Sequence, residues 1–185
     1  MCAILTEDSP KREAGQQRLG VVSNLLRARI LTISDRSSQG LREDTAGPTL
    51  AEYLRSNGID VDRISVVPDE EDQIKEILIS WADEGTLDLI VTTGGTGLSP
   101  RDVTPEATIA AVDRIVPGMA EAMRAQSLLK TPHAMISRAV VGVRGKALIV
   151  NLPGSPKGAI ENLEVLVPAL AHAIAKLQGD PSECA

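Results

Sequence analysis

Short runs rich in β-branched residues alternate along this chain with segments of helical periodicity, and this alternation restricts the fold more than any other feature. The strand-like runs are residues 28–33, 61–67, 87–91 and 146–151. Between them, apolar residues recur at the spacing of helices that bury one face. Such alternation is typical of a mostly parallel sheet covered by helices. The chain is therefore predicted to be an α/β protein.

The helical segments also carry end signals. Pro48 stands where the first position of a helix would fall, and Gly58 closes that helix. Thr104 is a suitable cap for a helix that begins at Pro105. Two further helices are predicted at residues 70–82 and 118–129. The last helix has an apolar stripe that is interpreted as core or, alternatively, as an oligomer interface: Leu163, Leu166, Val167, Leu170, Ile174 and Leu177.

Composition narrows the classes of function. With 185 residues and 43% apolar side chains, the chain suits one domain with a sizeable core. The 25 acidic residues exceed the 19 basic ones, giving a net charge of -6, which suits a generic binder of polyanions poorly. The sequence has no Phe, one Trp and one Tyr, so base stacking on aromatic platforms is not expected. An anionic ligand would need a shaped local site with a metal ion, and no nucleic-acid partner is expected.

The ends of the chain carry no site motif. Cys2 and Cys184 lie far apart in polar segments and form neither a metal-binding spacing nor a disulfide framework. We find no signal peptide and no apolar run near 18 residues, so a cytoplasmic protein without a membrane segment is expected. The predicted organisation is a flexible N-terminal tail over residues 1–24, one domain over 25–179 and a C-terminal tail over 180–185.

Polar clusters follow each predicted strand. They are Ser34 with Asp35, Pro68 with Asp69, the turn at residues 94–97, and residues 151–155. In open parallel α/β sheets, ligands bind outside the carboxyl ends of the strands. Because these clusters converge on one edge, that edge is the predicted ligand site.

The segment Thr93-Gly94-Gly95-Thr96-Gly97 allows a ligand to approach the backbone closely. Its successive N–H groups can form an anion-binding nest. The alternative is a tight turn that needs glycine for positive φ. The dinucleotide fingerprint is excluded because Pro100 stands at its last glycine, and no Gly-Lys-Ser/Thr follows to make a P-loop.

Two acids stand near this turn. Asp102 lies beside it, and Asp69 follows the preceding strand. A carboxylate beside a phosphate nest is repulsive unless Mg²⁺ joins it to phosphate oxygens. The two acids therefore suit a metal-assisted phosphoryl-type transfer. The alternatives are a helix-end acid for Asp102 and the cap of helix 70–82 for Asp69.

Other polar residues are less informative by themselves. Ser127 and Ser137 could hold a terminal phosphate or a pterin, although capping or solvent-exposed serines are the simpler interpretation. Arg138 and Arg144 are candidate phosphate contacts, and an ordinary surface role is again simpler. The two histidines have no partner pattern and receive no catalytic role.

The glycine turn together with residues 101–108 resembles the signature of the molybdopterin adenylyltransferases. These are the bacterial MogA type and the G domains of gephyrin and its plant counterpart. Further matching segments are residues 31–35, 67–70, 127–128, 134–138 and 151–156. The resemblance extends from about Ala28 to Gly179 and does not include the N-terminal tail.

This resemblance implies a three-layer α/β/α fold, a homotrimer, and transfer of AMP from Mg²⁺-ATP to the molybdopterin phosphate with release of pyrophosphate. It also makes a molybdenum-insertion protein an expected partner. The implied catalytic and metal-binding carboxylates are Asp69 and Asp102. The implied ATP phosphate contacts are Thr93, Gly94, Gly95, Thr96 and Gly97. The implied molybdopterin contacts are Ser34, Ser127, Ser137, Arg138, Pro153, Gly154 and Ser155.

Two other functions compete with this one. A non-catalytic, MoaB-like molybdopterin-binding protein would bind the pterin without turning over ATP, and the intact pair of acids argues against it. Residues 68–70 and 104–106 also favour the active type. A nucleotide pyrophosphatase, like the competence-damage proteins that carry a related domain, would need no pterin acceptor. The matching serine segments argue against this second alternative.

Overall fold

The computed structural model describes residues 25–182, so the predicted N-terminal tail and both cysteines lie outside the described residues. In the first half, the elements are β1 (Leu26–Ile33), α1 (Asp35–Ser38), α2 (Ala46–Ser56), β2 (Ile59–Val67), α3 (Glu71–Asp83) and β3 (Leu89–Thr93). In the second half, they are α4 (Thr104–Ala111), β4 (Arg114–Ile115), α5 (Pro117–Leu128), the 3₁₀ helix η1 (Pro132–Ile136), β5 (Val141–Arg144), β6 (Ala147–Leu152) and α6 (Pro156–Leu177).

The strands form one sheet in the order β2-β1-β3-β6-β5-β4. The pairings of β1 with β2, β1 with β3 and β3 with β6 are parallel, which confirms the predicted mostly parallel sheet. The sequence analysis missed β4 and β5, which join the edge antiparallel. They have only two and four residues, so neither is long enough to show a strand pattern.

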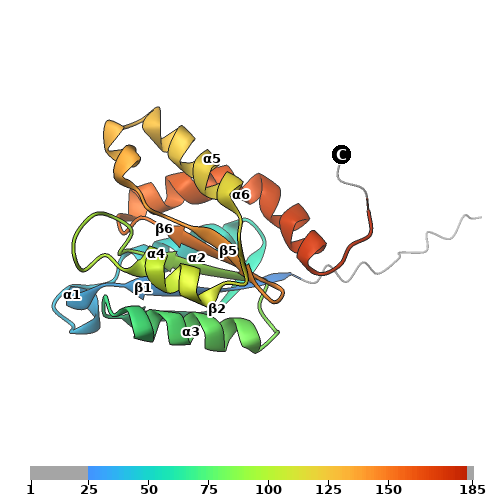
Figure 1. The fold of residues 1–185 in the computed structure, drawn as a ribbon, viewed down its shortest axis with the longest axis horizontal. Coiled ribbons are helices and arrows are strands. Elements are labelled where there is room, and N and C mark those ends of the chain that lie inside the picture. Colours follow the sequence, from blue (N-terminus) through green and yellow to red (C-terminus); the bar gives the residue numbers. More distant parts are fainter. Residues whose placement is uncertain (1–24, 183–185) are drawn as a thin grey trace, which may run out of the picture.

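Helices cover both faces of the sheet, as the predicted three-layer arrangement requires. One core cluster includes Leu54 of α2, Met123 of α5 and Leu163 of α6. The other includes Leu78 of α3 and Ala107 of α4. Figure 1 shows α5 and α6 on one side of the sheet and α3 on the other.

The final helix is more apolar than the sequence analysis recognised. By length and composition alone, α6 could cross a membrane. However, Leu163, Leu166, Leu170 and Ile174 on one face are buried in the domain core, with Val167 and Leu177 packed at its border. The apolar stripe is therefore core, as expected. Alanine and valine on the remaining surface raise the mean hydropathy of the helix.

Two predicted helix starts are wrong. Helix α2 begins at Ala46 rather than Pro48, because the Asp44 carboxylate accepts hydrogen bonds from the amides of Ala46 and Gly47 at 3.1 Å each. Helix α4 is capped by Val103, not Thr104. The Thr104 hydroxyl was expected to cap the helix. It is buried and instead donates to the Gly94 carbonyl at 2.9 Å, which is a tertiary contact.

Asn151 joins the sheet to the helix layer that contains α4. Its side-chain amide donates to the hydroxyls of Thr92 on β3 and Thr108 on α4, at 2.9 and 2.8 Å. Its side-chain oxygen, Oδ1, accepts from the Val140 amide at 3.1 Å. Asn151, Thr92 and Thr108 are fully buried. This network ties β6 to β3 and α4.

We predict that Asn151→Leu will lower the free energy of unfolding by about 2–4 kcal/mol, because it leaves several buried polar groups unpaired. Urea denaturation followed by circular dichroism measures the change. The control is Asn57→Ala at the exposed end of α2, where only exposed hydrogen bonds to Tyr53 and Ser56 are lost and about 1 kcal/mol or less is expected. Equal losses in the two variants would contradict a special role for the Asn151 network.

Candidate functional site

The carboxyl ends of four strands meet at one edge of the sheet. In register, Ile33 of β1 lies beside Val67 of β2, and Thr93 of β3 lies beside both Thr32 of β1 and Leu152 of β6. The residues that follow these strands are therefore brought together, as predicted. Two cavities open at this edge, with volumes of about 480 and 300 Å³.

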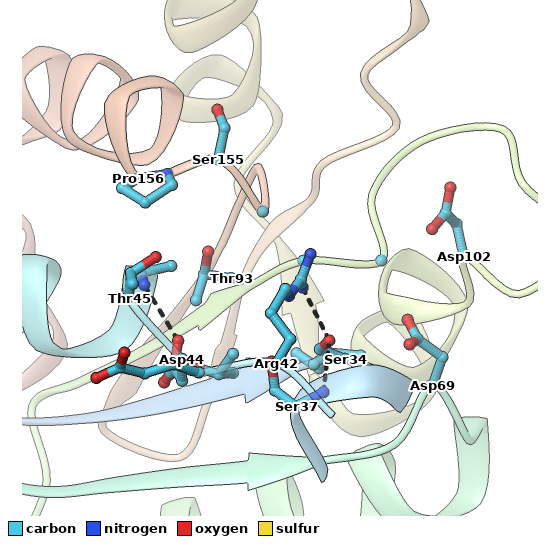
Figure 2. A pocket seen from close by; sticks show the side chains of 17 residues that line it. Ser34, Ser37, Arg42, Asp44, Thr45, Asp69, Thr93, Asp102, Ser155 and Pro156 are labelled. Atoms are coloured by element: carbon cyan, nitrogen blue, oxygen red, sulfur yellow. Dashed lines mark hydrogen bonds between the residues drawn. The ribbon is translucent and has the colours of Figure 1, made fainter. Parts of the chain in front are cut away.

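We call the larger one the acidic cavity. Its charged residues are Arg42, Glu43, Asp44, Asp69 and Asp102. It also contains these predicted site residues: Ser34, Thr93, Gly94, Gly95, Gly154 and Ser155. Figure 2 shows Asp69 and Asp102 on one side of the cavity and Asp44 and Thr45 on the other. The structure thus brings the two predicted essential acids into one cavity.

We call the smaller one the serine cavity. The predicted residues that line it are Thr96, Gly97, Ser127, Ser137, Pro153 and Ser155. Arg124, His133 and Asn162 also line it. Ser155 is common to both cavities. The predicted division between ATP and molybdopterin residues follows the two cavities only in part, since Ser34 and Gly154 lie on the acidic side, and Thr96 and Gly97 on the serine side. Which ligand each cavity receives stays a prediction.

The glycine turn lines both cavities and carries backbone amides that have no partner in the described part of the chain. Gly94 and Gly95 have φ values of +104° and +62°. The Gly94 amide donates to the Leu152 carbonyl at 3.1 Å, whereas the amides of Gly95, Thr96 and Gly97 have no partner within residues 25–182. Free N–H groups in a turn of this conformation are available to an anion.

Asp69 is held by an exchange of hydrogen bonds with Asp35. The Asp35 amide donates to Asp69 Oδ2 at 2.8 Å, and the Asp69 amide donates to Asp35 Oδ1 at 3.1 Å. The alternative role of Asp69 as the cap of α3 is wrong, because Glu70 occupies that position. Burial raises the pKa of Asp69, and the nearby charges of Asp35 and Asp102 raise it further.

Arg101 ties the loop that carries Asp102 to the ends of β1 and β2. Its guanidinium donates to both carboxylate oxygens of Asp35, at 3.0 and 2.9 Å, and to Glu70 at 2.8 Å. These hydrogen bonds lower the pKa of Asp35. Asp102 itself accepts from the Ser99 amide at 2.9 Å, so its carboxylate stabilises the loop rather than the start of α4.

Arg138 also holds this loop. Its guanidinium donates to the carbonyl oxygens of Gly97 and Asp102, at 2.7 and 2.5 Å, and pairs with Glu106. Arg138 is not among the residues that line either cavity. A direct contact with molybdopterin stays a prediction for this residue, since its donors serve the loop here.

Arg144 does not lie at this site. It forms two hydrogen bonds of 2.8 Å with Asp83 and one of 3.0 Å with the Ala111 carbonyl, and neither cavity includes it. The simpler surface interpretation therefore fits Arg144 better than a phosphate contact. The structure also adds Ser37, Arg42, Asp44 and Thr45, which the sequence analysis did not single out. Ser37 lies within α1 and the other three follow α1, so the end of β1 did not mark them as site residues.

The arrangement of acids fits a metal ion that arrives with a nucleotide. Among residues 25–182, no group of three or more His, Cys, Asp or Glu side chains could hold a metal ion. Asp69 and Asp102 nevertheless share a cavity and interact electrostatically. Mg²⁺ is usually held by one or two carboxylates together with substrate phosphates and water. The chain supplies the carboxylates for such a site but not a complete protein cage.

With its mostly parallel sheet, its glycine turn and two adjoining cavities, the chain is an α/β domain with a candidate ligand site at the carboxyl edge of its parallel strands. It belongs to the family described as the probable molybdopterin binding domain, whose model matches residues 29–172.

Similar proteins are known in sequence and structure. Over 154 residues the chain is 42% identical to a molybdopterin adenylyltransferase from Helicobacter pylori strain J99, covering 82% of this chain and 87% of that protein. It is 45% identical over 143 residues to the molybdopterin adenylyltransferase of Escherichia coli K12, covering 76% and 73%. A crystal structure of the molybdopterin biosynthesis enzyme MoaB from Thermus thermophilus is 52% identical, with a TM-score of 0.79, covering 85% of this chain and 99% of that one.

We predict that Asp69→Asn will raise the stability of the fold at neutral pH. Because its pKa is raised on folding, the folded state binds this proton more tightly than the unfolded state, and ionisation of the carboxyl destabilises the fold. An asparagine can still accept the Asp35 amide. The gain should be present at neutral pH and disappear as the pH falls through the raised pKa of the wild-type carboxyl.

Thermal unfolding across the acid and neutral range measures this difference. The control is Asp60→Asn on β2, an exposed carboxylate outside both cavities, which should change little. A lower melting temperature for Asp69→Asn at neutral pH would show that the ionised carboxylate stabilises the fold instead.

Proposed function

We propose that this chain is a molybdopterin adenylyltransferase, which transfers AMP from Mg²⁺-ATP to the phosphate of molybdopterin and releases pyrophosphate. One observation carries the proposal: two cavities adjoin at Ser155, one with the paired acids and the other with Ser127 and Ser137. A transfer between two bound substrates needs two such compartments. Membership of the molybdopterin-binding family and the names of the bacterial relatives supply the substrate class.

In the proposed reaction, an oxygen of the molybdopterin phosphate attacks the α-phosphorus of ATP. A new P–O bond forms there, the bond from the α-phosphorus to the bridging oxygen breaks, and pyrophosphate leaves with that electron pair. No covalent protein intermediate is required. The chain therefore acts by holding the two phosphates in line and by stabilising charge.

The residues at the junction are suited to that task. Ser155 caps α6 by accepting from the Gly158 amide at 3.2 Å, so the positive end of a 22-residue helix lies where the cavities meet. Gly95, which lines the acidic cavity, and Thr96 and Gly97, which line the serine cavity, have amides without a partner within residues 25–182. Mg²⁺ held by Asp102 and Asp69 would supply further neutralisation of phosphate charge.

A non-catalytic molybdopterin-binding protein is the second candidate, because the solved structure at 52% identity is named MoaB. The deciding experiment is incubation with Mg²⁺-ATP and molybdopterin, followed by chromatography and mass spectrometry. Adenylylated molybdopterin and pyrophosphate support our proposal. Pterin binding without ATP turnover supports the second candidate, and hydrolysis without adenylylated pterin supports a nucleotide pyrophosphatase. The homotrimer, the molybdenum-insertion partner and the cytoplasmic location stay predictions.

We predict that Asp102→Asn will lower adenylyl transfer by at least about a hundred-fold while leaving the fold intact, because a metal-binding carboxylate stabilises charge in the transition state. The amide oxygen of an asparagine can still accept the Ser99 amide, so the loop should keep its shape. Turnover, measured as pyrophosphate release, is compared with that of the Asp60→Asn control. Near-normal turnover of folded Asp102→Asn protein would rule out the assigned role.

We further predict that Ser137→Ala will weaken molybdopterin binding several-fold and leave ATP binding unchanged. Ser137 lines the serine cavity, and the loss of one neutral hydrogen bond is worth about 0.5–1.5 kcal/mol. Calorimetry with each ligand separates the two affinities. The control is Ser80→Ala on the exposed surface of α3. If ATP affinity falls while molybdopterin affinity holds, the assignment of the two cavities is reversed.

A further inference from the structure

Arg42 is the single cationic side chain among the described residues that line the acidic cavity. Four carboxylates share this cavity: Glu43, Asp44, Asp69 and Asp102. Arginine beside carboxylates ordinarily forms charge-assisted pairs with them. Yet within residues 25–182 no ion pair involves Arg42. Its positive charge therefore stays available inside the cavity.

A buried hydroxyl anchors Arg42. Its Nη2 donates to Ser34 Oγ at 2.9 Å, and Ser34 in turn accepts from the Ser37 amide at 3.2 Å. Ser34 is 7% exposed at the end of β1, so it offers a rigid attachment point. Figure 2 shows Arg42 between Asp44 and Asp69, with its guanidinium directed into the cavity. One corner of the guanidinium is used, and its other N–H groups face the open volume.

One carboxylate on the same loop, that of Asp44, is already committed. Asp44 accepts from the Thr32 hydroxyl at 2.8 Å and from the amides at the start of α2. It therefore fixes the loop to β1 and α2 and does not neutralise Arg42. The fold thus places a fixed guanidinium in a cavity whose other charges are negative.

We propose that Arg42 binds the β- and γ-phosphates of ATP, the part that leaves as pyrophosphate. This inference rests on the proposed function. Guanidinium forks match phosphate oxygens in geometry and charge. Arg42 lines the acidic cavity and not the serine cavity, so it lies on the side of the donor nucleotide. An acidic cavity needs such a cation to receive a triphosphate, and Arg42 also stabilises the negative charge that develops on the leaving group.

Binding of inorganic pyrophosphate, ATP and AMP, each with Mg²⁺, tests the proposal by calorimetry. Arg42→Gln should weaken pyrophosphate and ATP about ten- to a hundred-fold and leave AMP nearly unchanged, since AMP lacks both phosphates. Arg42→Lys should fall between wild type and Arg42→Gln, because it keeps the charge and loses the fork.

The matched control is Arg36→Gln, which removes the same charge from the exposed surface of α1, outside both cavities. It should bind all three ligands like wild type. Arg42→Gln with wild-type affinity for pyrophosphate, or an equal loss for AMP, would overturn the proposal. An equal loss in Arg36→Gln would also overturn it, because the lower affinity would then follow from the change in net charge and not from a contact with Arg42.

The outcomes separate this proposal from the function on which it rests. If the wild-type chain makes adenylylated molybdopterin and Arg42→Gln binds pyrophosphate normally, the role of Arg42 alone is wrong. If pyrophosphate binding depends on Arg42 but no adenylylated product forms, adenylyl transfer alone is wrong. Circular dichroism of each variant checks that this exposed loop residue can be changed without unfolding the domain.

Discussion

Gly94 lies so close to β1 that a Cβ atom there would come within 2.2 Å of the Ile33 carbonyl oxygen. No side chain fits this approach, and the φ of +104° is itself one that only glycine adopts readily. Gly154 packs against the same residue, since a Cβ there would meet the Gly94 Cα at 3.2 Å. The ends of β1, β3 and β6 can therefore converge, and both cavities depend on that convergence.

Around this glycine contact, arginines set the electrostatics of an acidic site. Arg101 binds Asp35 and Glu70 and so fixes the loop that carries Asp102. Arg138 binds two carbonyl oxygens of the same loop and pairs with Glu106. The guanidinium groups of both arginines are therefore bound to groups of the protein. The positive charge left in the acidic cavity belongs to Arg42, and the amides of the glycine turn add partial positive charge. An anionic substrate is thus received by a few fixed donors, although the chain carries a net charge of -6.

Much of the site followed from strand ends. Asp69, Asp102 and the glycine turn were found because each follows a recognisable buried strand, and parallel pairing brings such positions together. Thr104 was misjudged, and the loop contacts of Arg138 were not foreseen, for the opposite reason. Their roles depend on partners far away in sequence, Gly94 for the threonine and Gly97 with Asp102 for the arginine. Arg42, Asp44 and Thr45 were missed because α1 separates them from the end of β1, so no strand end marks their position.

By itself, the sequence determined the α/β class, the parallel core of the sheet, the place of the site and, through the family resemblance, the chemistry expected there. These depend on periodicity and on local order along the chain, which the residues carry directly. Only the tertiary structure decided that the site is divided into two cavities and that β4 and β5 extend one edge of the sheet in antiparallel pairing. It also decided that, within residues 25–182, Arg42 has no ion-pair partner whereas Arg101 and Arg138 do. Those outcomes depend on which side chains meet across long separations in the chain, and spacing in the sequence does not specify such meetings.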